Sequence, residues 1–454
     1  MSTMNQLGKY QPYPDYKDSG VEWLGVIPPE WQKMPLKRHC KVVSGYAFPS
    51  EMFIDSGLPV IRIGDIKSDG SVVLDDCKYI EKESGYLYSR FTIASGELLM
   101  AMTGATIGKA GWFKSDTKAF LNQRVGVFRV SGGFEYKFLW YVLNSSGYQE
   151  YIQLTAFGGA QPNISDTGML AYEAAFPTIN EQRTIAAFLD YETARIDQLI
   201  AKQQQLIELL KEKRQAVISH AVTKGLNPHA PMKDSGVEWL GQVPEHWGVM
   251  PIRHLSSFIG TGGTPKDPTS FTEEKDILWF SPGDFNGDLL IDKSSKYVTK
   301  SSVINNDVKI YSQNSVLIVG IGATLGKVAV CQHEFSCNQQ INIVTPNSLM
   351  CMYFMAYSLL AQTEQMKQIS NASTIGIMNQ EKTKNIRVAM PSLEEQNEII
   401  NYLKNKLDGF SKIMDRSSKA INLLQERRTA LISAAVTGKI DLRGWQPPKR
   451  EVAA

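Results

Sequence analysis

The chain has 454 residues, 43% of them hydrophobic and 21% charged, and its formal net charge at pH 7 is only +2. This composition is that of an ordinary soluble protein, and no uninterrupted apolar run is long enough to span a membrane. The small net charge argues against a protein that binds nucleic acid alone, because phosphate neutralisation needs a stronger basic surplus or positively charged partners.

The first distinctive element is a nine-residue word, KDSGVEWLG at 17–25, which recurs unchanged at 233–241. Further matches follow in the same order, and GATIGK (104–109) in the first copy corresponds to GATLGK (322–327) in the second. The copies also end alike, in KRQAVISHAVTKG (213–225) and RRTALISAAVTGK (427–439). A repeat of this length predicts two similar domains, each large enough for its own core.

Short β-like runs follow the opening word in each copy, broken by Gly, Asn, Asp and Ser as the turns of a mixed sheet require. In the first copy they are PVIRIGDI (59–66), GSVVLD (70–75) and RVGVFRV (124–130). In the second copy they are ILWFSP (277–282), SVLIVGIG (315–322) and INIVTP (341–346). Short helices are expected at comparable places, 135–145 and 348–360.

Each copy then changes to helical periodicity, which predicts one long helix over 180–224 and another over 393–443. PTINEQ (177–182) and PSLEEQ (391–396) open them with a proline, a Thr or Ser cap and an early glutamate. Residues seven apart form a heptad seam in the same register in both helices. The seam residues are Leu189, Ile196, Gln203, Leu210 and Val217 in the first helix, and Leu403, Phe410, Ser417, Leu424 and Leu431 in the second.

Gln203 and Ser417 occupy the same heptad step and are the polar members of the seam. If the two halves are related by a pseudo-twofold axis, the helices run antiparallel and these residues meet near it, where a polar pair sets register. The alternative is two helices that pack on their own domains and expose the polar step. A 40-residue helix spans roughly 60 Å, enough to hold two domains at a fixed separation.

We therefore predict an α+β fold in which two similar mixed α/β domains are joined by two long antiparallel coiled-coil helices with pseudo-twofold symmetry. The predicted boundaries are 1–179 for the first domain, 180–224 for the first spacer helix, 225–392 for the second domain, 393–443 for the second spacer helix and 444–454 for a polar tail.

The two GAT-x-GK words invite a phosphate-loop interpretation, which fails on spacing. A Walker loop needs four residues between its glycines and Ser or Thr after the lysine. Here three residues intervene, and Ala110 and Val328 follow. A tight glycine turn between strands is the better interpretation, and from it Lys109 and Lys327 could meet either DNA phosphate or water.

Amide side chains supply further candidates. Asn122, Gln123, Asn338 and Gln339 are of the type that reads adenine edges, although amides are also common where a strand turns. Arg124, which follows the first pair, is a candidate DNA contact as well. The four tryptophans of the repeated opening segments, Trp23, Trp31, Trp239 and Trp247, favour packing over base stacking.

Catalytic and metal signatures are missing from the sequence. The six histidines show no ligand spacing, there is no H-E-x-x-H, and an amino-methyltransferase would need a Pro-Pro-aromatic motif that the chain lacks. The five cysteines are Cys40, Cys77, Cys331, Cys337 and Cys351. None repeats between the copies, which favours packing thiols in a reducing compartment. With no signal peptide, we expect a cytoplasmic, non-catalytic protein that binds no metal.

The repeated SGVEWLG-x-(I/V)-P, the PTINEQ/PSLEEQ helix starts and the AVTGKIDLR tail together resemble the specificity subunit of type I restriction–modification systems over nearly the whole chain. The resemblance implies two target-recognition domains, each reading one half of a split double-stranded DNA site. It also implies that the helices set the spacing, dock the adenine-methylating modification subunits, of which we expect two, and join restriction (translocase and endonuclease) subunits in phage defence. S-adenosylmethionine, ATP and Mg²⁺ are then expected only in the partner subunits.

Two segments differ most between the copies and are the predicted reading loops. SGYAFPSE (44–51) in the first copy is at the position of GTGGTPKD (260–267) in the second, and AFGGAQPNIS (156–165) is at the position of NASTIGIMNQ (371–380). The competing functions are a protein-interaction scaffold that binds no DNA and a self-contained DNA-modifying enzyme. The sequence assigns no base to any residue, and it does not give the spacer length.

Overall fold

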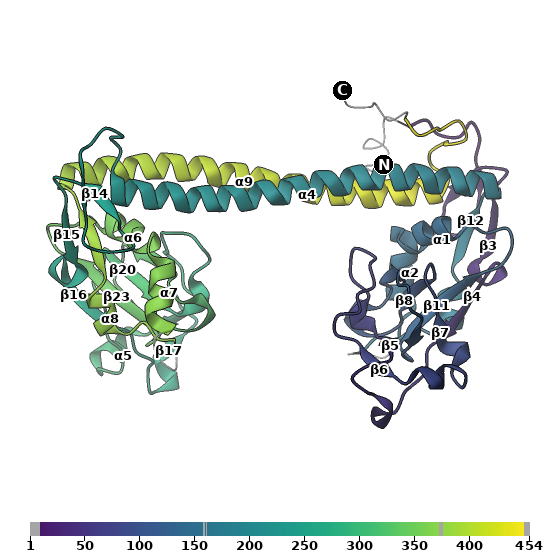
Figure 1. Ribbon diagram of the computed structural model, residues 1–454, viewed down its shortest axis with the longest axis horizontal. Helices are drawn as coiled ribbons and strands as arrows, with labels where there is room; N and C mark the ends of the chain where they lie inside the picture. The colour runs from purple at the N-terminus through teal and green to yellow at the C-terminus, as the bar shows by residue number, and fades with distance from the viewer. Residues whose placement is uncertain (1–9, 158, 160, 372–375, 449–454) are drawn as a thin grey trace. The chain divides into compact units, whose positions relative to one another are not determined.

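A computed structural model describes residues 10–157, 159, 161–371 and 376–448 (Figure 1). The contacts within it divide the chain into two units, Met1–Gln203 with Lys419–Ala454 and Gln204–Ser418. Each unit contains mixed sheets, short helices and one end of each of two long helices. The predicted α+β class with two similar mixed units is therefore confirmed.

The first unit is built on two four-stranded sheets, ordered β6-β5-β10-β7 and β4-β11-β8-β9, with two short ladders, β1-β2 and β12-β3. Its strands are β1 (Lys17–Asp18), β2 (Val26–Ile27), β3 (Gln32–Pro35), β4 (Cys40–Ser44), β5 (Leu58–Ile61), β6 (Lys78–Ile80), β7 (Thr92–Ile93), β8 (Leu98–Ala101), β9 (Ala110–Trp112), β10 (Ala119–Leu121), β11 (Val125–Val130) and β12 (Glu173–Phe176). Its short helices are α1 (Tyr136–Leu143), α2 (Ser146–Thr155) and α3 (Asp166–Leu170).

The second unit repeats most of this plan, with sheets ordered β17-β19-β18-β22 and β16-β23-β20-β21 and ladders β13-β14 and β15-β24. The difference is the fourth strand of the first sheet, since β17 pairs with β19, whereas β7 pairs with β10 at the opposite edge. Its strands are β13 (Met232–Asp234), β14 (Gln242–Pro244), β15 (Gly248–Pro251), β16 (Ser256–Thr261), β17 (Phe271–Thr272), β18 (Ile277–Phe280), β19 (Lys296–Val298), β20 (Ser315–Val319), β21 (Val328–Cys331), β22 (Phe335–Cys337), β23 (Ile341–Pro346) and β24 (Arg387–Met390). Its short helices are α5 (Lys300–Ile304), α6 (Met352–Leu360), α7 (Thr363–Asn371) and α8 (Gln380–Lys384).

The central strands are buried on both faces, which explains their continuous apolar sequence. In β8, Leu98 and Met100 belong to the core that α1 and α2 share, whereas Leu99 and Ala101 belong to a second core. Strand β20 alternates in the same way between two cores of the second unit. The sheet therefore forms a layer with apolar packing on either side.

Most of the predicted short elements are confirmed. Strands β11, β18, β20 and β23 and helices α1 and α6 fall within the predicted runs. PVIRIGDI holds β5 followed by a 3₁₀ turn at Ile63–Asp65. The strand predicted at 70–75 is wrong, because this stretch makes only isolated bridges at Ser71 and Val72. Gly70 has φ +84°, and the Asp69 carboxylate accepts the Ser71 N–H, so a turn forms here.

The two long helices are α4 (Ile179–Lys224) and α9 (Leu393–Val436), and both begin with the predicted cap. The Thr178 hydroxyl accepts from the N–H of Glu181 at 3.4 Å, and the Ser392 hydroxyl accepts from Glu395 at 3.2 Å. Helix α9 ends at Val436 rather than at the predicted 443. Gly438 there has φ +70°, which closes the helix in a left-handed cap.

A buried glutamine ties the start of each long helix to a short one. The Gln182 side-chain oxygen accepts from the N–H of Glu135, just before α1, at 2.9 Å. The Gln396 oxygen accepts from the N–H of Cys351, just before α6, at 2.7 Å. The final glutamine of PTINEQ and PSLEEQ therefore positions the short helix against the long one.

Within each unit the long helices pack on one another in opposite directions (Figure 1). In the first unit, Leu189 from the first half of α4 shares a core with Leu431 from the last part of α9, and Arg428 donates to Asp197 at 2.9 Å. In the second unit, Val222 from the end of α4 shares a core with Leu403 from the start of α9. The helices therefore run antiparallel, as predicted.

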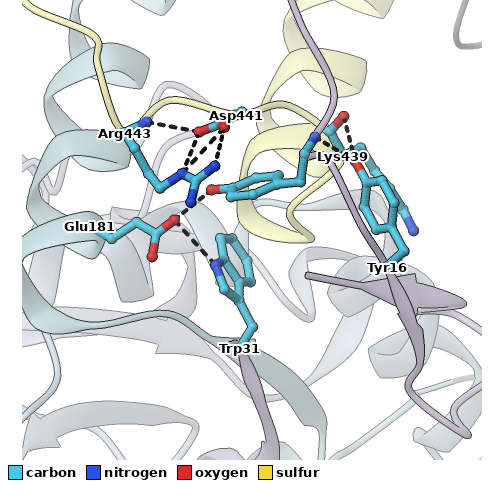
Figure 2. A network of polar contacts seen from close by, with 7 residues as sticks. Tyr16, Trp31, Glu181, Lys439, Asp441 and Arg443 are labelled. Atoms are coloured by element: carbon cyan, nitrogen blue, oxygen red, sulfur yellow. Dashed lines mark hydrogen bonds and ion pairs between the residues drawn. The ribbon is translucent and has the colours of Figure 1, made fainter. Parts of the chain in front are cut away.

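A polar network joins the segment before β1 to the segment after α9 within the first unit, and Figure 2 shows its members. The Glu181 carboxylate accepts from the Tyr13 hydroxyl at 2.5 Å and from the indole N–H of Trp31 at 3.2 Å. Burial and this bond to Glu181 raise the pKa of Tyr13. Arg443, paired with Asp441 at 2.6 Å, lies over the Tyr13 ring. The segment before β1 and the segment after α9 are therefore held together.

The second unit repeats the central bond of this network. The Glu395 carboxylate accepts from the indole N–H of Trp247 at 2.9 Å, and His246 lies 3.0 Å from the same oxygen. Trp31 and Trp247 are both fully buried, which confirms their packing role. Each long helix therefore starts with a glutamate bound to a buried indole.

Glu395→Ala should lower the free energy of unfolding by about 1–3 kcal/mol, because it leaves the buried Trp247 N–H without an acceptor. Glu394→Ala is the matched control, since Glu394 is exposed and adjacent in the same helical turn. Urea unfolding of both variants measures the difference, and equal losses of stability would contradict this role for Glu395.

Candidate nucleic-acid interface

Asn122, Gln123 and Arg124 form the turn between β10 and β11, fixed by backbone bonds. The N–H of Asn122 donates to the Ile61 carbonyl at 3.0 Å, and the Asn122 carbonyl accepts from Val125 at 2.9 Å. The Asn122 side chain is half-buried, whereas Gln123 and Arg124 are exposed. The turn therefore presents one amide and one guanidinium to solvent.

Asn338 and Gln339 form the corresponding turn between β22 and β23 of the second unit. The N–H of Asn338 donates to the Phe280 carbonyl at 2.8 Å, and its carbonyl accepts from Ile341 at 3.0 Å. The Thr264 hydroxyl contacts both side chains, lying 3.4 Å from the Asn338 amide nitrogen and donating to the Gln339 carbonyl oxygen. Sequence reasoning missed Thr264, and its place in the divergent segment 260–267 was the available signal.

The first pair of predicted reading segments, 44–51 and 260–267, lies directly against these turns. A Cβ on Gly45 would stand 2.3 Å from the Asn122 carbonyl, and one on Gly262 would stand 2.3 Å from the Asn338 carbonyl. Only glycine allows this approach of two backbones. Each unit therefore joins a divergent segment to an amide-bearing turn through an equivalent glycine.

The two divergent segments are anchored by different chemistry. Tyr46 and Phe48 pack in an aromatic cluster with Tyr88, with the Tyr46 and Tyr88 rings 5.0 Å apart. In the second unit, Asp307 accepts from the N–H of Lys266 at 3.0 Å and from the Ser270 hydroxyl at 2.6 Å. The bond from Ser270 is the main reason that the pKa of Asp307 is lowered.

The GAT-x-GK words form tight turns between β8 and β9 and between β20 and β21, as predicted. Gly104 and Gly108 have φ of +72° and +83°, and Gly322 and Gly326 have +76° and +83°. Each turn contacts the second divergent segment of its unit. Gly104 donates to the Pro162 carbonyl at 2.9 Å, and Gly320, next to the second turn, accepts from Met378 at 2.7 Å.

Several predicted elements therefore meet in each unit: the amide turn, the glycine turn and both divergent segments. Residues 158 and 160 of the segment 156–165, and residues 372–375 of the segment 371–380, lie outside the described residues. Asn342, which the sequence gave no reason to select, links these parts in the second unit. It donates to the Met378 carbonyl at 2.6 Å and accepts from the Thr261 hydroxyl at 3.0 Å.

The two candidate lysines have different surroundings. Lys327 donates to the Phe285 carbonyl at 2.7 Å. Lys327 also lines a cavity of about 270 Å³ whose other walls include Lys211 and Arg214 of α4. Asn338 and Gln339 do not line it. For the half-buried Lys109, no ammonium partner is found among the described residues. Lys327 is thus engaged with its own unit and directed toward α4.

The seam residues of the long helices are buried or half-buried. Leu189, Ile196, Leu210, Leu403, Ser417 and Leu431 are buried, and Gln203, Val217, Phe410 and Leu424 are half-buried. Their pairing across the helices stays a prediction. Trp445, in the predicted polar tail, packs on Phe188 of α4 with ring centroids 5.5 Å apart.

The described residues contain no cluster of three or more His, Cys, Asp or Glu side chains that could hold a metal ion. All five cysteines are free, and burial raises the pKa of each thiol, which confirms packing groups rather than reactive thiolates. No helix in the part of the chain that the structure describes is long and apolar enough to cross a membrane. The exposed amides, Arg124 and glycine turns offer hydrogen bonds and charge to a polyanion.

Two stretches of the chain, 28–209 and 244–423, match the family model described as type I restriction modification DNA specificity domain. A putative type I restriction enzyme MjaX specificity subunit from Methanocaldococcus jannaschii is 21% identical, over 92% of this chain and 96% of its own. The type I restriction enzyme EcoBI specificity subunit from Escherichia coli is 23% identical, over 93% of this chain and 89% of its own.

Solved structures share the fold. A chain from a study of complex assembly and conformational transition of the type I R-M system superimposes with a TM-score of 0.71, at 17% identity, covering 91% of this chain and 99% of that chain. The HsdS subunit from Thermoanaerobacter tengcongensis gives a TM-score of 0.51 at 18% identity, covering 91% of this chain and 98% of that one.

Gly262→Ala should destabilise the second unit by about 1–3 kcal/mol, because its new Cβ meets the backbone oxygens of Cys337 and Asn338. Gly263→Ala is the matched control, since a Cβ there meets nothing within 4 Å. The melting temperatures of the two variants measure the difference. A Gly262→Ala protein as stable as the Gly263→Ala protein would show that the segment does not need this close approach.

Proposed function

Because the chain belongs to the family of type I restriction modification DNA specificity domains, we propose that it is the DNA-specificity subunit of a type I restriction–modification complex. It is non-catalytic, and the methyltransferase and endonuclease activities belong to partner subunits. Each unit recognises one half of a bipartite DNA site. The cofactors S-adenosylmethionine, ATP and Mg²⁺ are bound by those partners, and the complex acts in the cytoplasm.

The observation that carries this proposal is the pattern of what the two units share. The order of one four-stranded sheet and of three strands of the other, the glycine turns, the amide turns and the helix starts correspond between them. The segments that pack on the amide turns differ in sequence and in anchoring. Two different half-sites read by one scaffold require such a division, because the bases read must change while the frame does not.

We propose that the exposed amides and Arg124 contact base edges in the major groove or the phosphates that flank it. The candidates are Lys109, Asn122, Gln123, Arg124, Lys327, Asn338 and Gln339. Two weakly binding units gain affinity when both half-sites are present at the right separation, because the second binding step becomes intramolecular. The net charge of +2 suits a subunit that shares the DNA with partners.

We propose that the long helices set the distance between half-sites. Helix α4 has 46 residues and α9 has 44, which correspond to lengths of about 69 and 66 Å. The antiparallel packing of the two helices within each unit supports this role, because paired helices bend less than single ones. Modification subunits dock on the complex, and we expect two. Restriction subunits complete it.

Deleting one heptad from the middle of both helices should shorten the gap between half-sites by about three base pairs, since seven residues span roughly 10 Å and one base pair about 3.4 Å. The half-sites themselves should stay the same. Gln204→Ala, an exposed change that preserves length, is the control and should leave the gap unchanged. Sequencing of methylated adenines gives the recognition sites of the wild-type protein, the deletion variant and the control. New half-sites at the old spacing would contradict the spacer role.

Lys109→Ala should weaken binding to specific and unrelated DNA alike, and should lower the salt slope of log K by about 1, if the free ammonium meets phosphate. Lys327→Ala should change both quantities less, because that ammonium already bonds to the Phe285 carbonyl. Fluorescence anisotropy of the complex with its modification subunit, across a salt series, compares them. Unaltered binding by Lys109→Ala would remove Lys109 from the interface. Binding that is independent of salt and of DNA would instead favour a scaffold that acts only on proteins.

A further inference from the structure

The repeated word KDSGVEWLG builds the same loop in both units, between β1 and β2 and between β13 and β14. In the first unit the Asp18 carboxylate accepts from the N–H of Gly20 at 2.9 Å, and the Ser19 hydroxyl accepts from the N–H of Val21 at 3.1 Å. In the second unit the corresponding bonds, to Asp234 and Ser235, measure 3.0 and 3.1 Å. Both glycines of each loop have positive φ. The backbone of the loop therefore requires the Asp, the Ser and both glycines.

Packing requires two further residues of the word. Val21 and Leu24 are buried in the first unit, and Val237 and Leu240 are buried in the second. The fold thus accounts for six of the nine residues of the word. The lysine, glutamate and tryptophan that remain are exposed in both copies.

The tryptophan is the same in both copies, although the residues that it packs on differ between them. Trp23 stacks on Tyr172 at 5.6 Å and donates its indole N–H to the Glu173 carbonyl at 3.1 Å. In the second unit Ile386 takes the place of Tyr172, since each accepts from the residue that follows the β3 or β15 proline. Trp239 has no aromatic or hydrogen-bond partner among the residues that the structure describes, and it is 39% exposed. Its packing alone gives no reason to keep the indole.

The positions just after the word behave differently from those within it. Two of the three buried pairs there are identical, Pro28 with Pro244 and Trp31 with Trp247, and the third, Ile27 and Val243, differs by one methylene. Exposed residues differ, and they are the pairs Val26 and Gln242, Pro29 and Glu245, and Glu30 and His246. Within the word, exposed residues match as well as buried ones. Lys17 bonds to the Pro29 carbonyl at 2.5 Å in the first unit, but the exposed glutamate and tryptophan are under a constraint that folding does not supply in both units.

We infer that this exposed surface, Glu22 with Trp23 in the first unit and Glu238 with Trp239 in the second, is a docking site for the modification subunit, with one copy bound on each unit. The inference rests on the proposed function. Two unchanged surfaces on otherwise divergent units fit one kind of partner bound twice. An exposed indole next in sequence to an exposed glutamate suits a basic side chain of that partner, which can stack on the ring and pair with the carboxylate.

The place of the loop in the first unit favours the modification subunit over the restriction subunit. Trp23 lies beside the start of α2, where a Cβ on Gly147 would stand 3.9 Å from the indole. Helix α2 bonds through Gln149 to the Gly108 carbonyl of the glycine turn, at 3.0 Å, and ends just before the segment 156–165. A subunit that modifies a base of the half-site read by this unit must bind close to these reading segments.

The test is native mass spectrometry of the full chain mixed with the modification subunit of the same system, at a series of concentrations. The variants are Glu22→Lys, Glu238→Lys and the double variant, with Trp239→Ala as a second, uncharged change. Glu245→Lys is the control, because it reverses an exposed charge in the second unit just outside the word. Melting temperatures equal to wild type show that each variant is folded.

Wild-type protein and the control should bind two modification subunits. Each single variant should bind one of them roughly tenfold more weakly, as the loss of an interface hot spot does, and the double variant should weaken both. A double variant that binds two copies like the control would overturn the docking site and leave the proposed function intact. The same variants are then measured with the restriction subunit added, and loss of restriction subunits alone would overturn the choice of partner. If wild-type protein binds no modification subunit, the proposed function itself fails.

Discussion

The start of each long helix is fixed by one hydrogen bond, from a buried indole N–H to the glutamate in the first helical turn. Trp31 bonds to Glu181 and Trp247 bonds to Glu395, at 3.2 and 2.9 Å. The tryptophan belongs to the segment that opens each unit, and the glutamate belongs to the helix that leaves it. An indole buried without an acceptor would destabilise the unit, so the bond fixes where the helix begins relative to the sheets. The buried glutamines next to these glutamates add a second attachment, to α1 and α6.

A helix with a fixed origin allows the rest of each unit to vary without moving the frame. The segments 44–51 and 260–267 share the glycine contact and two backbone hydrogen bonds at the amide turn, and beyond these one is held by aromatic rings and the other by Asp307. Such segments can change sequence while sheet order and helix position stay constant. This separation of frame from reading surface gives a physical basis for a subunit that exchanges one half-site without altering the other.

Much of the frame could be predicted from the sequence, because its signals are local or repeated. The helix caps, the glycine turns and the two-domain plan all follow from short patterns that occur twice. The strand expected at 70–75 failed because Gly70 and Asp69 form a turn, which overrides the β propensity of the two valines. The end of α9 was placed too late, since the left-handed glycine at 438 ends the helix before the polar tail.

The candidate site was harder to predict, because its residues come together through contacts distant in sequence. Thr264 meets Gln339, and Asp307 holds the backbone at Lys266, across gaps that no periodicity reveals. The two lysines at equivalent places in the sequence also have different surroundings, since only Lys327 has a carbonyl within reach among the described residues. Equivalence in sequence therefore located the turns correctly but did not determine where their side chains point.

The central claim is that the two units each recognise one half of a single DNA site. The most direct measurement is a genome-wide map of methylated adenines in a host that carries this gene with its modification partner, compared with the same host lacking the gene. The account predicts a motif of two short parts separated by unspecified bases, present only with the gene. A continuous motif, or a map that does not change when the gene is removed from an active system, would contradict it.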